Sequence, residues 1–144
     1  MGRIKIQVPE QFSFSCELPV RITDINYGGH AGNDTILTLI HEARMQYLAA
    51  LGYTEMNMAG AGLIMADAGI EFKKELFYGE KLIAWVTAGS FSKIGFSLYY
   101  KLEKVNKDSR AIVALVKTGM ICYDYALKKI VPIPGEALLK MQTV

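Results

Sequence analysis

The feature that most constrains the fold is one long helical segment followed by a series of closely spaced strand segments. Residues 33–51 carry apolar side chains at helical spacing, whereas the segments after residue 61 alternate apolar and polar side chains as strands do. Short turns join these later segments, so neighbouring strands are expected to be antiparallel. One helix cannot cover both faces of such a sheet. The order therefore predicts an α+β fold in which an antiparallel sheet wraps around one long central helix and leaves its other face to solvent or to a second subunit.

The helix has recognisable ends and two different faces. Asn33 is predicted to cap its N-terminus, Asp34 adds a negative charge to the first turn, and Gly52 is predicted to end it. The apolar stripe comprises Ile36, Ile40, Ala43, Tyr47 and Ala50. A second, more polar stripe comprises Asp34, Thr38, His41, Glu42 and Met45.

Strand segments and a short terminal helix account for most of the remaining chain. Strands are predicted for residues 12–22, 61–72, 82–88, 96–103 and 111–123, with a short edge strand at 129–133. Asn106, Lys107 and Asp108 form the predicted hairpin turn before the last long strand. Pro134 is predicted to stand in the first turn of the terminal helix.

The composition fits one soluble domain spanning residues 1–144. Of the 144 residues, 51% are hydrophobic, which is enough for a single core. The formal net charge of +2 is too small to predict a nucleic-acid partner. No stretch approaches the ~20 apolar residues of a membrane span, and residues 1–12 lack the apolar segment of a signal peptide. Cys16 and Cys122 have no zinc-binding spacing. We therefore expect a cytoplasmic protein with no metal, membrane or nucleic-acid partner.

Residues 21–53 carry a motif, RITDINYGGHAGNDTILTLIHEARMQYLAALGY. It resembles the signature of the 4-hydroxybenzoyl-CoA thioesterase-like family of acyl-CoA and acyl-carrier-protein thioesterases. That signature reads Asp-x-Asp-x-x-Gly-His-x-x-Asn, followed by a helix that carries a Glu, an Ala and an Arg. The matching positions are Asp24, Gly29, His30, Asn33, Glu42, Ala43 and Arg44. The segment MADAGIEFKKELFYGEKLIAWV resembles the family's second strand, turn and third strand. The resemblance, over about residues 20–123, implies a hotdog fold and thioester hydrolysis.

One position departs from this signature. Where the family has its second Asp, this chain has Asn26. An amide has no useful basicity and cannot act as a general base, although it can orient water or donate a hydrogen bond to a thioester carbonyl. His30 is the first candidate for the base because imidazole titrates near neutral pH, and Glu42 is the second. Asp24 is expected either to orient His30 or Asn26 or to cap the loop.

The loop of Gly28, Gly29 and His30 leads into the helix that begins near Asn33. A helix N-terminus offers free N–H groups and a partial positive charge, which suit a developing oxyanion. Glycines allow a backbone to approach a ligand closely. The predicted catalytic residues are Asn26, His30, Glu42 and Asp24, and the predicted substrate-binding residues are Gly29, Asn33, Asp67, Ser92 and Lys93.

These features favour an acyl-CoA thioester hydrolase that needs no cofactor, because coenzyme A is part of the substrate. An acyl-carrier-protein thioesterase and a non-catalytic hotdog that binds acyl thioesters are the alternatives, and Asn26 favours the latter. A hotdog dehydratase is a further alternative, but its histidine-bearing helix pattern is not evident. A sheet with an uncovered face and edge predicts a homodimer or homotetramer.

Overall fold

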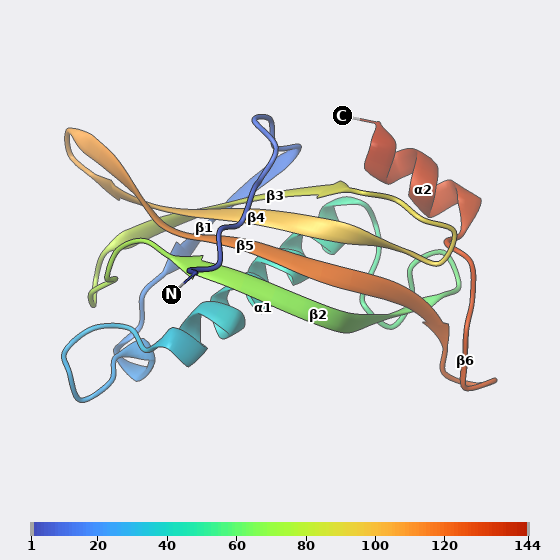
Figure 1. Ribbon diagram of the computed structural model, residues 1–144, viewed down its shortest axis with the longest axis horizontal. Coiled ribbons are helices and arrows are strands. Elements are labelled where there is room, and N and C mark those ends of the chain that lie inside the picture. Colours follow the sequence, from blue (N-terminus) through green and yellow to red (C-terminus); the bar gives the residue numbers. More distant parts are fainter. Residues whose placement is uncertain (1, 144) are drawn as a thin grey trace.

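The computed structural model describes residues 2–143 and contains one antiparallel sheet with two helices (Figure 1). The elements in chain order are β1 (Phe14–Pro19), the 3-10 turn η1 (Ile22–Asp24), α1 (Asn33–Ala50), β2 (Gly62–Phe72), β3 (Lys81–Gly89), β4 (Gly95–Asn106), β5 (Ser109–Asp124), β6 (Lys129–Ile130) and α2 (Gly135–Gln142). The sheet order is β1-β3-β4-β5-β2, and β6 pairs with β5. Every pairing is antiparallel, as the short turns predicted.

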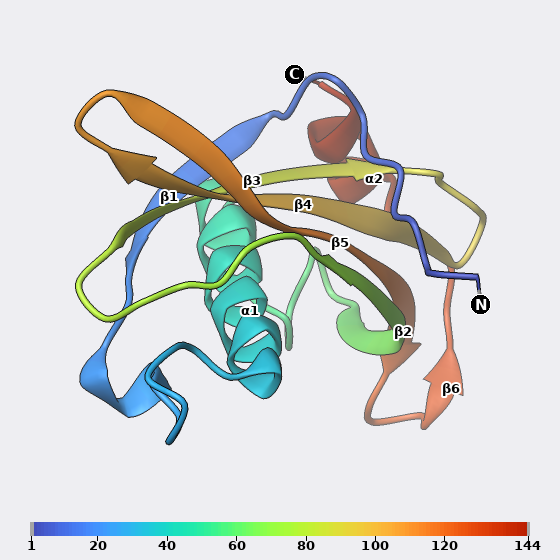
Figure 2. The same ribbon diagram turned by 60° about the vertical axis from the view of Figure 1, so that its left-hand side comes forward.

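Helix α1 lies along one face of the curved sheet, and the main core fills the space between them (Figure 2). Alternation along the strands decides which side chains enter this core. From β3 and β4 the buried side chains include Leu82, Ala84, Val86, Leu98, Tyr100 and Leu102. The predicted apolar stripe of the helix is buried except at Ala50 in the last turn, and Leu39, Arg44 and Leu48 are buried in addition. The strands at the two edges are β1 and β2.

The two ends of α1 differ in how well the sequence predicted them. Gly52 has φ of 88°, and its N–H and that of Tyr53 bond the carbonyls of Ala49 and Leu48, which is a complete Schellman ending. The predicted cap at Asn33 is wrong. Gly32 is the N-cap, and no side chain caps the helix.

The packing around Gly32 explains this difference. A Cβ at position 32 would lie 2.6 Å from Asp34 Oδ1. The preceding residue, Ala31, is tied by its N–H to the Leu76 carbonyl at 2.7 Å. This tertiary bond fixes the turn into the helix one residue earlier than the propensity of Asn33 suggests.

Two further boundaries differ from the prediction. The first strand ends at Pro19 rather than near residue 22, because the Arg21 N–H donates to the Asp24 carboxylate at 2.8 Å and the chain enters η1 instead. Pro134 is the N-cap of α2 rather than a residue of its first turn. Among the described residues, no helix is both long enough and apolar enough to cross a membrane.

Candidate functional site

The loop between η1 and α1 places Asn26 and His30 opposite each other. The Asn26 N–H donates to the His30 carbonyl at 3.0 Å, and the Gly29 N–H donates to the Asn26 carbonyl at 3.1 Å. Ile25 and Ala31 form an isolated antiparallel bridge at the base of the loop. Gly29 has φ of 86°, a left-handed conformation that favours glycine. The loop is therefore a short closed hairpin that carries two predicted site residues.

The side chains of Asn26 and His30 both lie beside Gly28. A Cβ at position 28 would lie 3.2 Å from Asn26 Oδ1 and 3.5 Å from His30 Nε2. Asn26 Oδ1 accepts the Gly28 N–H at 2.9 Å. Within residues 2–143 the Asn26 Nδ2 group donates no hydrogen bond, so the donor end of the amide is available to a ligand.

The two nitrogens of His30 have different surroundings. Nδ1 lies 3.1 Å from the Ala31 carbonyl oxygen, which can only accept, so Nδ1 carries the proton in the neutral ring. Nε2, with the lone pair, lies 3.8 Å from Glu75 Oε1. The ring also meets Phe77 edge to face, with centroids 6.4 Å apart. Sequence reasoning missed Glu75, because only the folded sheet brings the turn after β2 next to this loop.

A cavity of about 260 Å³ opens where His30 meets the N-terminus of α1. Its lining comprises His30, Ala31, Asn33, Ile36, Phe72, Lys73, Lys74, Glu75, Leu76 and Val113. We call it the His30 cavity. The N–H groups of Asn33 and Asp34 donate no hydrogen bond within the described part of the chain. A histidine, an amide donor and an open helix N-terminus together can polarise a carbonyl and accept a proton from water.

Asp24 supports the segment before the loop through contacts with Arg21 and Thr35. Its buried carboxylate accepts hydrogen bonds from the Arg21 backbone N–H and from Arg21 Nη2 at 3.1 Å. Burial acts to raise the pKa of Asp24, but the hydrogen bonds and charge of Arg21 outweigh it and lower the pKa below its ordinary value. The Thr35 hydroxyl donates to the Asp24 carbonyl at 3.3 Å. No hydrogen bond joins the Asp24 side chain to Asn26 or His30 within residues 2–143, an arrangement that fits the capping role.

Glu42 lies in a different cavity. A cleft of about 470 Å³ between β1 and α1 is lined by Glu17, Leu18, Pro19, Arg21, Thr38, Leu39, His41, Glu42, Met45 and Gln46. The Glu42 carboxylate accepts a hydrogen bond from Gln46 Nε2 at 2.9 Å. At 1.5 Å of rise per residue, Glu42 stands about 14 Å along the axis from Asn33. One chain therefore does not bring Glu42 together with Asn26 and His30.

The predicted substrate-binding residues of the β half also lie away from the His30 cavity. Asp67 sits at a bulge of β2, where Oδ1 accepts the Gly119 N–H at 2.9 Å and Lys117 Nζ at 3.2 Å. Ser92 closes the turn between β3 and β4 through two side-chain hydrogen bonds and one backbone hydrogen bond with Gly95. Asp67 and Ser92 line one shallow hollow of about 230 Å³, and Lys93 does not. The structure thus brings together Gly29, Asn33, Asn26 and His30. Asp67, Ser92 and Lys93 lie apart from this group.

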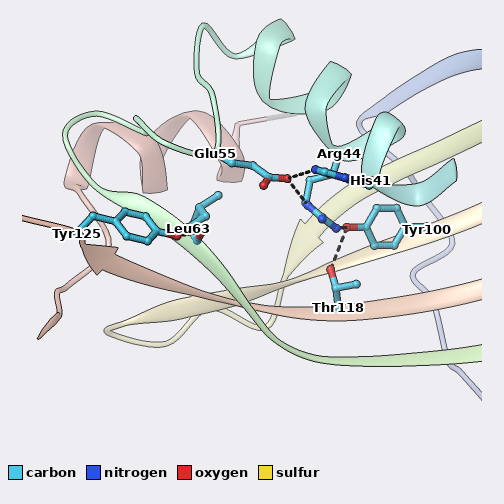
Figure 3. A network of polar contacts seen from close by, with 7 residues as sticks. All are labelled: His41, Arg44, Glu55, Leu63, Tyr100, Thr118 and Tyr125. Atoms are coloured by element: carbon cyan, nitrogen blue, oxygen red, sulfur yellow. Dashed lines mark hydrogen bonds and ion pairs between the residues drawn. The ribbon is translucent and has the colours of Figure 1, made fainter. Parts of the chain in front are cut away.

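A buried polar network that the sequence did not reveal anchors α1 to the sheet (Figure 3). Arg44 Nε donates to Glu55 Oε1 at 2.8 Å, and its Nη1 donates to the Tyr100 hydroxyl at 3.2 Å. The Tyr100 and Thr118 hydroxyls lie 2.9 Å apart, and His41 Nε2 lies 3.3 Å from Glu55 Oε1. Burial raises the pKa of Tyr100. The described residues contain no cluster of three or more His, Cys, Asp or Glu that could hold a metal ion.

Comparison with known proteins places this geometry in a family. The family model of the thioesterase-like superfamily matches residues 20–141 of the chain. This match confirms the resemblance to thioesterases that the motif at residues 21–53 indicated. No curated protein matches the chain.

Several solved structures share the fold. A 1,4-dihydroxy-2-naphthoyl-CoA thioesterase from Synechocystis has a TM-score of 0.81 at 21% identity, covering 91% of this chain and 96% of its own. A thioesterase-superfamily protein from Jannaschia sp. CCS1 has a TM-score of 0.83 at 16% identity, with coverages of 94% and 84%. A mutant 4-hydroxybenzoyl-CoA thioesterase complexed with 4-hydroxybenzoyl-CoA has a TM-score of 0.81 at 11% identity, with coverages of 90% and 98%. At these identities the likeness shows the fold, an antiparallel hotdog sheet.

Proposed function

The chain belongs to the thioesterase-like superfamily and is a thioester hydrolase, and from this premise we propose that it hydrolyses acyl-CoA thioesters at the His30 cavity. The observation that carries the proposal is that Asn26 and His30 both lie beside Gly28, and that His30 lines a cavity at the open N-terminus of α1. Neighbours named as 1,4-dihydroxy-2-naphthoyl-CoA and gentisyl-coenzyme A thioesterases support coenzyme A as the thiol of the substrate.

The carbonyl oxygen of the thioester is polarised by donors. The free N–H groups at the start of α1 and the Nδ2 of Asn26 are the donors that this chain offers. As water attacks the carbonyl carbon, negative charge develops on this oxygen, and donors already in place stabilise it without reorganisation. Asn26 therefore acts as an electrophilic group in this proposal, not as a base.

His30 accepts the proton. Its Nε2 carries the lone pair, so it removes a proton from the attacking water as the C–O bond forms. Collapse of the tetrahedral intermediate breaks the C–S bond. The proton then passes to the leaving sulfur, which yields a carboxylic acid and free coenzyme A thiol. Glu42 is a weaker candidate for the base because it lines the other cavity.

The anionic part of coenzyme A needs cations near the site. Lys73 and Lys74 line the His30 cavity, whereas Lys93 does not. Lys73 Nζ is already paired with Glu71 Oε2 at 2.8 Å, so Lys74 is the better candidate for a phosphate contact. Asp67 and Ser92 remain proposed contacts for a more distant part of the substrate.

A second copy of the chain is part of the proposal. β2 is an edge strand whose exposed apolar side chains include Ile64, Met65 and Phe72. Such an edge invites pairing with another strand. Because Phe72 also lines the His30 cavity, a homodimer paired along β2 would cover the cavity from one side. In that assembly α1 would serve as the central helix of each hotdog.

The test is thiol release from aliphatic and aromatic acyl-CoAs, measured with a thiol reagent. His30→Ala is expected to lose roughly 10²–10⁴ in rate, the range for a general base. His41→Ala is the matched control, because His41 is the other histidine and lines the other cavity. Asn26→Asp in the His30→Ala background is expected to recover part of the rate by supplying a carboxylate base. Release of thiol from acyl carrier protein only, or from no thioester, would favour one of the two alternatives.

A further inference from the structure

Glu75 places a carboxylate beside the proposed base, and no motif in the sequence draws attention to it. Its Oε1 lies 3.8 Å from His30 Nε2, on the side of the ring where the lone pair is. The two residues line the same cavity. A carboxylate in this place has little to offer the neutral ring, but it stabilises the ring once Nε2 has gained a proton.

The turn that carries Glu75 is held from three directions. The Leu76 carbonyl accepts the Ala31 N–H at 2.7 Å, which joins the turn to the residue after His30. Lys104 Nζ donates to the Glu75 carbonyl at 2.9 Å and lies 5.4 Å from the centroid of the Phe77 ring. Phe77 in turn packs edge to face on His30. The spacing between Glu75 and His30 is therefore set by the backbone and by β4, although the Glu75 side chain itself is 63% exposed.

We propose that Glu75 is a positioning residue that acts through His30, stabilising the imidazolium formed when His30 takes a proton from the attacking water. This inference rests on the proposed function. Glu75 touches neither substrate nor water in this role. Its effect is electrostatic, so it depends on the charge at position 75 and on the pH.

Other charged groups near His30 set the background for this effect. They are Lys73 and Lys74 in the same cavity, Asp34 in the first turn of α1, and Lys104 and Glu80 behind the Glu75 turn. Lys73 and Lys104 are neutralised by Glu71 and Glu80, at 2.8 Å and 3.4 Å. Lys74 opposes Glu75 in its effect on a protonated ring. Among the described residues, Glu75 is the acidic side chain that lies within ion-pair distance of His30 Nε2, at 3.8 Å.

The experiment measures kcat/KM for acyl-CoA hydrolysis against pH for the parent, Glu75→Gln and Glu75→Asp. Two unit charges about 4 Å apart in a water-like medium interact weakly, which corresponds to about a fivefold change in rate. Glu75→Gln is therefore expected to lose about fivefold at its plateau and to move the acid limb of the profile toward lower pH. Glu75→Asp keeps the charge and is expected to return the limb toward the parent position. Glu136→Gln is the matched control, because Glu136 is 65% exposed and lies on α2.

A second measurement does not depend on activity. The chain has two histidines, so the imidazole signals in an NMR titration are assigned by the loss of one signal in His30→Ala. The His30 titration midpoint is expected to fall in Glu75→Gln and to stay unchanged in Glu136→Gln. If the parent hydrolyses acyl-CoA but both the rate profile and the titration are the same in Glu75→Gln, the role of Glu75 is refuted and the proposed function stands. If the parent releases no thiol, the proposed function fails, and an unchanged titration would refute the Glu75–His30 coupling separately.

Discussion

Neutralising Glu55 tests how strongly the buried network holds α1 on the sheet. The Arg44 side chain is only 7% exposed and Glu55 is its anionic partner at 2.8 Å, with Glu55 itself 26% exposed. Glu55→Gln keeps the size of the side chain and an acceptor oxygen but removes the charge. The guanidinium is then left buried without its counterion, beside the Tyr100 hydroxyl and the new amide.

The magnitude follows from the burial of the pair. Removing one partner of a buried ion pair costs about 3–5 kcal/mol, whereas a surface pair contributes about 0–1 kcal/mol. The Arg44–Glu55 pair is closer to the buried case, but water reaches Glu55, so the lower end applies. We expect Glu55→Gln to lower the free energy of unfolding by about 3 kcal/mol, or Tm by roughly 6–12 °C for a chain of this size.

The assay is urea unfolding at one fixed protein concentration, because an oligomer would make the stability depend on concentration. Glu136→Gln provides the exposed control. Adding Arg44→Met to Glu55→Gln removes the uncompensated cation, while the Tyr100 hydroxyl keeps its partner Thr118 at 2.9 Å. The double variant is therefore expected to recover part of the lost stability. A loss below about 1 kcal/mol in Glu55→Gln, the value of a surface pair, would refute the reasoning.

Three further predictions test other parts of the structure. Gly119→Ala is expected to destabilise by about 0.5–1.5 kcal/mol in thermal melts, because its Cβ would lie 2.7 Å from Asp67 Oδ1 and would displace this carboxylate from the Gly119 N–H and Lys117; in an Asp67→Ala background the same change should cost less. The pKa of Asp24 is lower in the folded chain than in the unfolded chain, so the bond to Arg21 stabilises the fold at pH values above the ordinary carboxyl pKa. This stabilisation is lost as the pH falls through the pKa of Asp24 in the folded state. Arg21→Ala should make the stability less dependent on pH in this acid range. The mass in solution at micromolar concentration should be at least dimeric, and charged residues in place of Ile64 and Met65 should yield monomers.

The sequence predicted the elements well and their polar contacts poorly, and α1 shows why. Its periodicity predicted the helix and most of its buried face, because burial of apolar side chains is a local pattern. Its buried Arg44 was not predicted, because the partners Glu55 and Tyr100 are 11 and 56 residues away. The same holds at the N-terminus, where the bond from Ala31 to Leu76 overrides the capping preference of Asn33.

The candidate site likewise has a part formed by local contacts and a part formed by long-range contacts. The loop that carries Asn26 and His30 is local, since hydrogen bonds between residues four or fewer apart close it, and the motif in the sequence was enough to find it. Glu75 and Lys74 reach the site only through the pairing of β2 in the sheet, and a single sequence gives no register for such long-range pairs. Glu42 is the opposite case. Its place in the motif suggested that it lies near Asn26 and His30, but within one chain the helix carries it to the cleft between β1 and α1.

In the proposed mechanism Asn26 and His30 together take the place of the aspartate that the family signature carries at position 26. An aspartate at position 26 would supply two acceptor oxygens, one for the Gly28 N–H and one for water. The amide keeps the first of these contacts, at 2.9 Å, and turns the second atom into a donor. Exchanging an acceptor for a donor removes a base and adds a group that binds a carbonyl oxygen. The proton must then go elsewhere, and the neighbouring imidazole already presents its lone pair at Nε2, with the Glu75 carboxylate 3.8 Å away. In the proposed mechanism the base therefore lies at His30, within the same loop.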